Sequence, residues 1–215
     1  MSIEQALFLY IVIIFSAIIH EYCHGWMAYQ EGDPTAKYAG RLTLNPIPHL
    51  DSFGTVILPL LLLVGFPLLL GTSPFFFGYA KPVPINPNNF RDQRRGLILV
   101  SLAGPGSNFL VAIILGLFVR FFPGLAIGGL SISPFIAFIT FVNIWLGLFN
   151  LIPVPPLDGS KLLFGLTAGR GGALDFLRGA GSWFGILFAL FIAFTFLPYL
   201  GSLIFTLITG GNIAM

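Results

Sequence analysis

Charged residues are scarce in this sequence, and their scarcity excludes an ordinary soluble protein. Asp, Glu, Lys and Arg make up 8% of the 215 residues, whereas soluble domains carry about 25%. Hydrophobic residues make up 56%, and the mean hydropathy is +0.94. We therefore expect an all-α integral membrane protein with almost no room for a separate soluble domain. The net charge of +2 is also too small to indicate nucleic-acid binding.

Cysteine is almost absent, and the N-terminal residues lack basic side chains. Cys23 is the only cysteine, so the chain cannot form an internal disulfide. We favour a small apolar packing role for Cys23 over metal coordination. Residues 1–5 contain no Lys or Arg, and cleavage of a signal peptide would also remove the candidate metal-binding motif described below. We therefore expect the first apolar segment to be retained as a membrane span.

The motif His20-Glu21-Tyr22-Cys23-His24 stands near the end of the first apolar segment. Residues four apart on a helix share a face, so His20 and His24 could bind one Zn²⁺. Glu21 could then act on a metal-bound water. Placing an ionisable side chain at membrane depth costs about 2.5–3.5 kcal/mol. Metal binding would explain why three such side chains stand together in an apolar segment. The alternative is that all three already lie at the membrane surface.

Apolar runs predict about four full transmembrane helices, at residues 6–29, 96–119, 131–152 and 183–205. Segment 52–80 is uncharged but interrupted by proline and glycine, and we expect it to be broken and re-entrant. Segment 37–50 contains proline turns and is predicted to be extended or a short hairpin. His49, within it, is more typical of a loop residue than of a metal ligand. We treat residues 1–215 as a single membrane-embedded domain, with a catalytic core at about 6–162.

Two polar motifs occur in or after the later spans. Gly104-Pro105 is expected to break its helix, with Asn108 nearby at membrane depth. This pattern fits either a packing notch with a kink or a part of a functional site. Asp158 follows the span 131–152 on a proline-rich segment and suits a third metal ligand, because catalytic zinc sites use three protein ligands and one water. A simple turn at the membrane surface explains Asp158 equally well.

The topology depends on whether Asp158 reaches the histidine pair. If it does, the spans 6–29 and 131–152 must end on the same side of the membrane. Three crossings up to residue 152 satisfy this condition, and four do not, which supports re-entry of segment 52–80. Nine of the ten Lys and Arg residues then fall on one side, which the positive-inside rule makes cytoplasmic. We expect a multi-pass protein of the cell membrane with its site toward the cytoplasm.

Taken together, the motifs resemble the site-2 protease family of intramembrane zinc metalloproteases. The resemblance rests on three motifs in order: His20-Glu21-Tyr22-Cys23-His24, Gly104-Pro105 with Asn108, and Asn150-x-x-Pro153-x-x-Pro156-Leu157-Asp158-Gly159. Two further stretches, Gly32-Asp33-Pro34-Thr35-Ala36 and Gly78-Tyr79-Ala80-Lys81-Pro82-Val83-Pro84, look like the compact subgroup without PDZ or nucleotide-sensing domains.

The resemblance implies a role for each matched residue. It implies that His20, His24 and Asp158 bind one zinc ion per chain and that Glu21 is the general base. It also implies that Asn150 helps to hold the substrate backbone or the oxyanion, and it gives a supporting role to Gly104, Pro105 and Asn108. The expected activity is that of a zinc-dependent intramembrane endopeptidase, which hydrolyses peptide bonds in or near transmembrane segments of membrane proteins.

Two other functions remain open from the sequence. One is a metal-dependent membrane transporter, in which His and Asp line a permeation path. The other is a proteolytically inactive binder of membrane segments. An acid directly beside a ligand histidine, together with a late third ligand, favours hydrolysis over transport. The presence of Glu21 and all three proposed ligands argues against the inactive binder. The expected partner is a membrane-protein substrate with a transmembrane helix; the sequence indicates neither its identity nor the oligomeric state.

Overall fold

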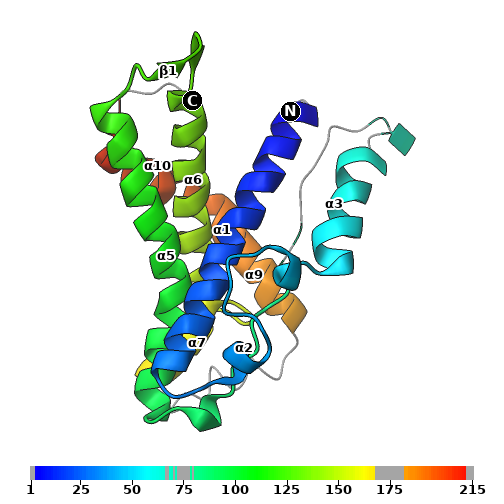
Figure 1. Cartoon of the computed structure of the whole chain (residues 1–215), viewed down its shortest axis with the longest axis vertical. Coiled ribbons are helices and arrows are strands. Elements are labelled where there is room, and N and C mark those ends of the chain that lie inside the picture. Colours follow the sequence, from blue (N-terminus) through cyan, green and yellow to red (C-terminus); the bar gives the residue numbers. More distant parts are fainter. Residues whose placement is uncertain are drawn as a thin grey trace. The chain divides into compact units, whose positions relative to one another are not determined.

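The computed structural model describes residues 3–65, 68–69, 71, 78, 80–167 and 182–211 (Figure 1). Three described helices are long and apolar enough to cross a membrane, and a bent helix pair makes up to four. The prediction of an all-α membrane protein with about four full spans is therefore confirmed. The chain divides into two compact units, residues 1–90 and 91–215, which are described separately. The single domain stays a prediction.

The first unit is built on helix α1, Ile3–Gln30, which extends the predicted span 6–29 at its N-terminal end. Its 28 residues make it about 42 Å long, more than enough to cross ~30 Å of hydrocarbon. A turn then reverses the chain, and Gly32 enables it with a φ of 112°, which glycine adopts without strain. The short helix α2, Thr35–Tyr38, packs beside α1 after this turn.

Segment 37–50 is not the extended or hairpin element predicted. After α2 it forms bends and then the 3₁₀ turn η1, Ile47–His49, and it contains no strand. Local side-chain bonds explain the difference: Asn45 N donates to Thr43 Oγ1 at 3.1 Å, and Ile47 N donates to Asn45 Oδ1 at 3.1 Å. These bonds satisfy backbone donors that a hairpin would have paired with a second strand.

Segment 52–80 begins with irregular helical turns. The π-helix η2, Ser52–Ile57, is followed by α3, Leu58–Leu60, and the π-helix η3, Leu61–Gly65. Asp51 caps this element by accepting from Phe53 N at 3.1 Å and Gly54 N at 2.6 Å. The segment is broken, as predicted. Whether it re-enters the membrane depends on residues up to 79, most of which lie outside the described part of the chain.

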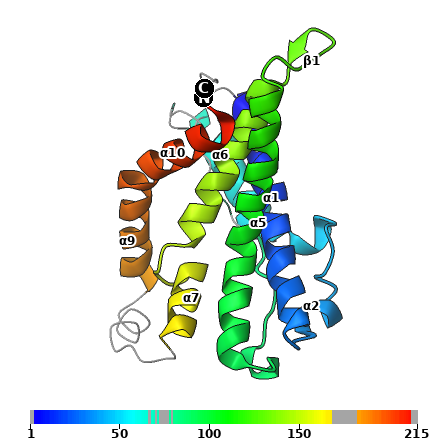
Figure 2. The ribbon, with the colours of Figure 1, turned by 90° about the vertical axis from the view of Figure 1, so that its left-hand side faces the viewer.

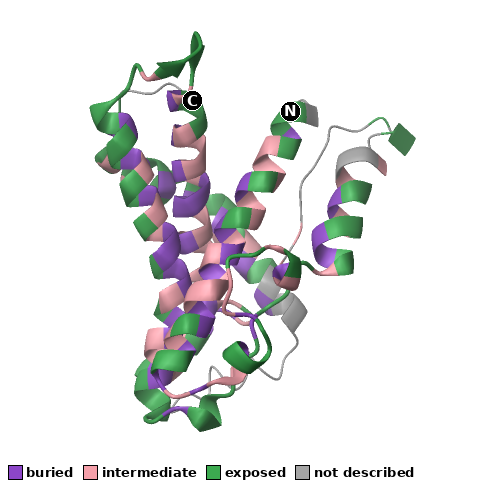
Figure 3. Cartoon of the chain, in the orientation of Figure 1, coloured by how far each residue is buried: buried purple, intermediate pink, exposed green. Residues whose placement is uncertain are grey.

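The second unit packs helices α5, Gln93–Phe121, and α6, Ser133–Asn150, side by side (Figures 1 and 2). Both exist where spans 96–119 and 131–152 were predicted. With α10, Leu197–Thr209, they enclose an apolar core, and Figure 3 shows buried residues recurring along α5 and α6 between exposed ones. The buried members of this core are Ala112, Val119, Ala137, Ile144 and Phe205.

The predicted break at Gly104-Pro105 does not occur. Helix α5 continues through Pro105, and both Gly104 and Pro105 are buried. An interior proline costs a helix about 3 kcal/mol because its backbone cannot donate and its ring crowds the preceding turn. The helix continues in spite of that cost, so the Gly104-Pro105 pattern marks a buried stretch of one helix.

A small hairpin between α5 and α6 was not predicted. Strand β1, Ala126–Ile127, pairs antiparallel with β2, Leu130–Ser131. Gly128 and Gly129 join the strands with φ values of 59° and 85°. Two consecutive residues with positive φ make the type I′ turn that matches strand twist, and glycine adopts it readily. The Gly-Gly pair was therefore the available signal for this hairpin.

The last predicted span, 183–205, is two helices instead of one. Helix α9, Ser182–Thr195, and helix α10 meet at a bend of 48° (Figure 2). Pro198 lies in the first turn of α10, where its missing N–H leaves no helical bond unmade. The chain therefore starts a new helix at this point and continues to Thr209, beyond the predicted end.

Candidate metal centre

Helix α1 presents His20 and His24 on one face, as their spacing predicted. Their Nε2 atoms lie 3.0 Å apart, and their rings meet edge to face at 84°. Both side chains are buried, with 6% and 5% of their surface exposed. Two nitrogen ligands of one tetrahedral zinc ion lie ~3.3 Å apart, since Zn–N distances are about 2.0–2.1 Å. The pair is therefore close to the separation that a shared metal ion requires.

Asp158 is the first residue of helix α7, Asp158–Leu166, which follows a proline-rich segment of turns and bends. The side chain is buried, and Lys161 Nζ lies 2.9 Å from its Oδ1 atom. Gly159 fixes the position of this helix start: a Cβ on Gly159 would run into the carbonyl oxygens of Leu151 and Ile152. The backbone that carries Asp158 is thus held in close contact with the preceding turn.

Helix α7 is also fixed at its other end. Arg94 Nε donates to Gly165 O at 3.1 Å, and Arg94 Nη2 donates to Leu166 O at 3.0 Å. These two carbonyls lie in the last turn of α7, where a helix leaves acceptors unused and favours a cation. Gly165 allows close contact with α5, because a Cβ there would lie 2.7 Å from Ile98 Cγ1. Asp158 therefore starts a helix that is anchored at both ends.

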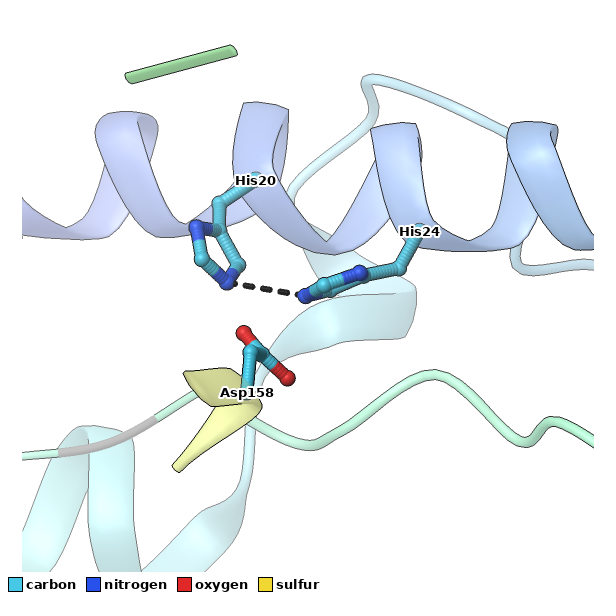
Figure 4. Close-up of side chains that lie close together, drawn as sticks. All are labelled: His20, His24 and Asp158. Atoms are coloured by element: carbon cyan, nitrogen blue, oxygen red, sulfur yellow. Dashed lines mark hydrogen bonds between the residues drawn. The ribbon is translucent and has the colours of Figure 1, made fainter. Parts of the chain in front are cut away.

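The three proposed metal ligands come together (Figure 4). The donor atoms of His20, His24 and Asp158 all lie within 4.8 Å of one another, and all three residues are buried. Two imidazoles and one carboxylate are zinc ligands, and three protein ligands leave a fourth position for water or substrate. The group could therefore hold a catalytic metal ion, and its chemistry fits zinc.

Glu21 is half-buried beside the first histidine, and its carboxylate is held by the main chain. Its Oε2 atom accepts a hydrogen bond from Val83 N at 2.8 Å. A carboxylate can take a proton from water and pass it on, so Glu21 has the chemistry that the predicted general base requires. The assignment of that role stays a prediction.

The remaining predicted residues lie within the second unit. Asn150 ends helix α6 and donates from Nδ2 to Leu146 O at 3.0 Å within the same helix. Asn108 is fully buried and donates from Nδ2 to Asn143 Oδ1 at 3.0 Å. Asn143 donates in turn to Ile139 O at 2.9 Å. Asn108 thus links α5 to α6, while the oxyanion role of Asn150 stays a prediction.

The sequence interpretation assigned no role to Asn143, although a signal was available. An amide side chain within an apolar run costs free energy unless it finds a hydrogen-bond partner. Asn108 and Asn143 each stand in an apolar span, so each could have been predicted to partner the other. The sequence does not show which faces of the two helices meet, and only the structure pairs them.

His49 is buried in the first unit, with its Nε2 donating to Thr43 O at 2.8 Å. Among the described residues it does not belong to the metal-binding group, in keeping with its interpretation as a loop residue. Cys23 is half-buried, forms no disulfide and is also outside that group among the described residues.

Comparison with known proteins adds a second line of evidence. The model of Peptidase family M50 matches residues 125–194. The chain is 41% identical over 166 residues to the "Putative zinc metalloprotease YwhC" of Bacillus subtilis (strain 168), an alignment that covers 73% of this chain and 67% of that protein. It is 30% identical over 152 residues to the "Putative zinc metalloprotease Rip2" of Mycolicibacterium smegmatis, with 68% of this chain and 52% of that protein covered.

No solved structure gives a significant match. The chain spans about half the length of the mycobacterial relatives. Its similarity to the Bacillus protein extends over two thirds of that relative, and the family model matches independently. The chain therefore belongs to peptidase family M50, the site-2 protease family of metalloproteases.

Proposed function

We propose that this metalloprotease is a zinc-dependent intramembrane endopeptidase, which cleaves peptide bonds in or near transmembrane segments of other membrane proteins. The observation that carries the proposal is the donor group His20, His24 and Asp158. Two of its members lie on a helix of membrane-spanning length and composition. At 1.5 Å per residue, His20 is ~15 Å from the C-terminal end of α1, a position that supports chemistry within the depth of the bilayer.

The ligand atoms would be the two Nε2 atoms of the histidines and a carboxylate oxygen of Asp158. Zinc held there would supply Lewis-acid activation of a water molecule and of the peptide carbonyl. Glu21 removes a proton from the attacking water as the new C–O bond forms. It then delivers that proton to the amide nitrogen as the C–N bond breaks. Asn150 is the proposed donor to the developing oxyanion.

The substrate must present an unwound stretch of chain at this site. A transmembrane helix satisfies its carbonyls internally, so each scissile bond is shielded until the helix opens locally. A substrate helix that contains residues with weak helix propensity opens at a lower free-energy cost. We therefore propose single-span membrane proteins with such a break as the substrate class. The positive-inside pattern supports a multi-pass protein of the cell membrane, with this site toward the cytoplasm.

The test combines metal content with cleavage of a single-span substrate by purified protein in nanodiscs. We expect one zinc per wild-type chain, loss of zinc in Asp158→Ala, and retained zinc without cleavage in Glu21→Gln. His49→Gln is a matched control, because it changes a buried histidine outside the metal-binding group. Normal cleavage by Glu21→Gln would contradict the role of the base. Zinc flux into sealed vesicles without any cleaved product would instead support a transporter.

A further inference from the structure

Residues 81–90, called here the strap, are tied to the rest of the first unit at their N-terminal end. Lys81 N donates to His49 O at 2.9 Å. Arg41 Nη2 donates to Lys81 O at 2.5 Å and to Pro82 O at 3.3 Å. Arg41 is itself buried, with 5% of its surface exposed. A buried guanidinium thus binds two consecutive carbonyls of the strap, and the first residues of the strap have a fixed position.

The strap is tied a second time, five residues after its start. Asn86 N donates to Asp33 Oδ2 at 2.7 Å, and Asn89 Nδ2 donates to Asp33 Oδ1 at 2.8 Å. Asp33 is fully buried at the turn that follows α1. Hydrogen bonds to a buried carboxylate are charge-assisted and stronger than those between neutral groups. The strap is therefore held on both sides of its middle residues.

Between these two ties, the sequence Pro82-Val83-Pro84 leaves a single backbone donor. Proline has no N–H group, so Val83 N–H is the only main-chain donor among the three residues. That donor is directed to Glu21 Oε2 at 2.8 Å, across 62 positions of sequence. The flanking prolines also restrict the backbone on both sides of Val83. The strap thus presents one N–H group to one carboxylate oxygen from a stiff segment.

Gly25 allows the strap to come this close to α1. It lies one helical turn after Glu21, on the same face. A Cβ on Gly25 would lie 3.0 Å from Val83 Cγ1, tighter than ordinary packing. Val83 is buried, with 6% of its surface exposed. The missing side chain at Gly25 and the buried side chain of Val83 together seat the strap against the helix that carries Glu21.

We propose that the main-chain N–H of Val83 is a positioning group for Glu21, an inference that rests on the proposed function of Glu21 as general base. The bond occupies Oε2 and leaves Oε1 as the oxygen that exchanges protons with water and with the leaving amine. A base that transfers a proton twice in one reaction must keep its geometry between the two steps. The strap provides this with a rigid donor that has no proton equilibrium of its own near neutral pH.

The first test compares Val83→Pro with Val83→Ala. Val83→Pro removes the N–H from a position that already lies between two prolines, whereas Val83→Ala keeps the donor and shortens the side chain. We expect Val83→Pro to lower kcat by about 10- to 100-fold, the range caused by small displacements of catalytic groups. KM and zinc content should stay at the wild-type values. Val83→Ala loses only side-chain packing and keeps the N–H donor, so its kcat should fall less than that of Val83→Pro. Wild-type kcat in Val83→Pro would overturn the proposal.

The second test does not measure cleavage, and it does not depend on whether the Val83→Pro variant folds. Hydrogen exchange is followed on the peptide that contains Pro82-Val83-Pro84, in which Val83 contributes the only amide of the three. We expect this amide to exchange slowly in the wild type and at least tenfold faster in Glu21→Ala, while the amides of α5 stay unchanged. Equal protection in both proteins would overturn the proposal. A wild type with Glu21-dependent protection but no zinc-dependent cleavage would contradict the proposed function and leave the contact standing.

Discussion

Lys161 Nζ lies 2.9 Å from Asp158 Oδ1, so a cation three residues along α7 contacts the proposed third metal ligand. The Asp158 side chain is 7% exposed and the Lys161 side chain 52%, so a solvent-accessible ammonium reaches a buried carboxylate. In this pair, Lys161 binds one oxygen of the carboxylate that is the proposed third metal ligand. Lys161 therefore compensates a buried negative charge that zinc would compensate more strongly.

The first prediction concerns Lys161→Met, which removes the cation and keeps the aliphatic side chain. We expect the metal-free protein to lose about 2–4 °C in Tm, because a buried carboxylate is left less well compensated and a partly exposed pair contributes at most about 1 kcal/mol. The zinc-loaded protein should lose less, since the metal then neutralises Asp158. Melting curves with and without chelator measure the difference.

Lys161→Arg is the control for this first prediction. It keeps a cation within reach of Asp158 and should melt like the wild type in both states. If Lys161→Met lowered Tm equally with and without zinc, the pair would have no connection to the metal centre. A larger loss in the zinc-loaded state would contradict the prediction, because Lys161 would then support the metal-bound form instead of compensating Asp158 in its absence.

The second prediction concerns Asp33, whose pKa is shifted by its surroundings. Burial raises the pKa, but hydrogen bonds from Thr35, Asn89 and Asn86 together outweigh burial and hold the pKa of Asp33 below its ordinary value of 3.8. The folded state therefore binds fewer protons here than the unfolded state. The resulting stabilisation is complete well above pH 3.8. It is lost as the pH falls from that value through the lower pKa of the folded protein.

Asp33→Asn should therefore melt at a lower temperature than the wild type at pH 7. The difference should shrink as the pH falls below about 4, because the wild-type carboxyl is then protonated as well. Asp92→Asn is the comparison, since Asp92 is an exposed cap that accepts from Arg95 N. If Asp33→Asn and Asp92→Asn lowered the melting temperature equally and independently of pH, the hydrogen bonds to Asp33 would contribute no more to stability than an exposed helix cap.

The third prediction concerns the Asn108–Asn143 pair. Replacing Asn143 by Leu removes the acceptor of a fully buried amide, and unsatisfied buried donors cost about 1–3 kcal/mol. The double variant Asn108→Leu/Asn143→Leu leaves neither amide of the pair in an apolar environment. It should therefore lose less stability than the sum of the two single variants. Unfolding in mixed detergent micelles measures the coupling free energy between Asn108 and Asn143. Hydrogen bonds between membrane helices show coupling free energies of about 0.6–1.7 kcal/mol. Strict additivity would mean that the bond does not hold α5 to α6.

The predicted spans were correct where one physical rule dominated, namely the burial of long apolar runs. The histidine pair was also predictable, because the i, i+4 spacing fixes two side chains on one helix face. Pro105 and Pro198 show the limit of prediction from the sequence. Both are prolines inside apolar runs, yet α5 continues through the first and the chain bends 48° before the second. Tertiary packing decides between these outcomes, and a single sequence does not show which neighbours will support the helix.

The contacts of Glu21 and Asp33 lay beyond prediction for another reason. Each carboxylate accepts from backbone or amide groups more than 50 residues away, in a strap that is irregular apart from the 3₁₀ turn Pro87–Asn89. Periodicity identifies faces of helices and strands, but it assigns no partner to an irregular segment. The Pro-Val-Pro pattern did limit the donors to one, and the structure supplied the acceptor.

The last prediction concerns Gly159, where a single methyl group should displace the proposed ligand. A Cβ on Gly159 would overlap the carbonyl oxygens of Leu151 and Ile152, which are backbone atoms and cannot move aside cheaply. Gly159→Ala should therefore shift the start of α7 and lower zinc affinity at least tenfold, while leaving the His20–His24 pair intact. Gly106→Ala is the matched control, because a Cβ there has nothing within 4 Å. Cobalt(II) titration separates the outcomes: a site built from the two histidines alone should bind cobalt equally in both variants, whereas a site that includes Asp158 should weaken only in Gly159→Ala.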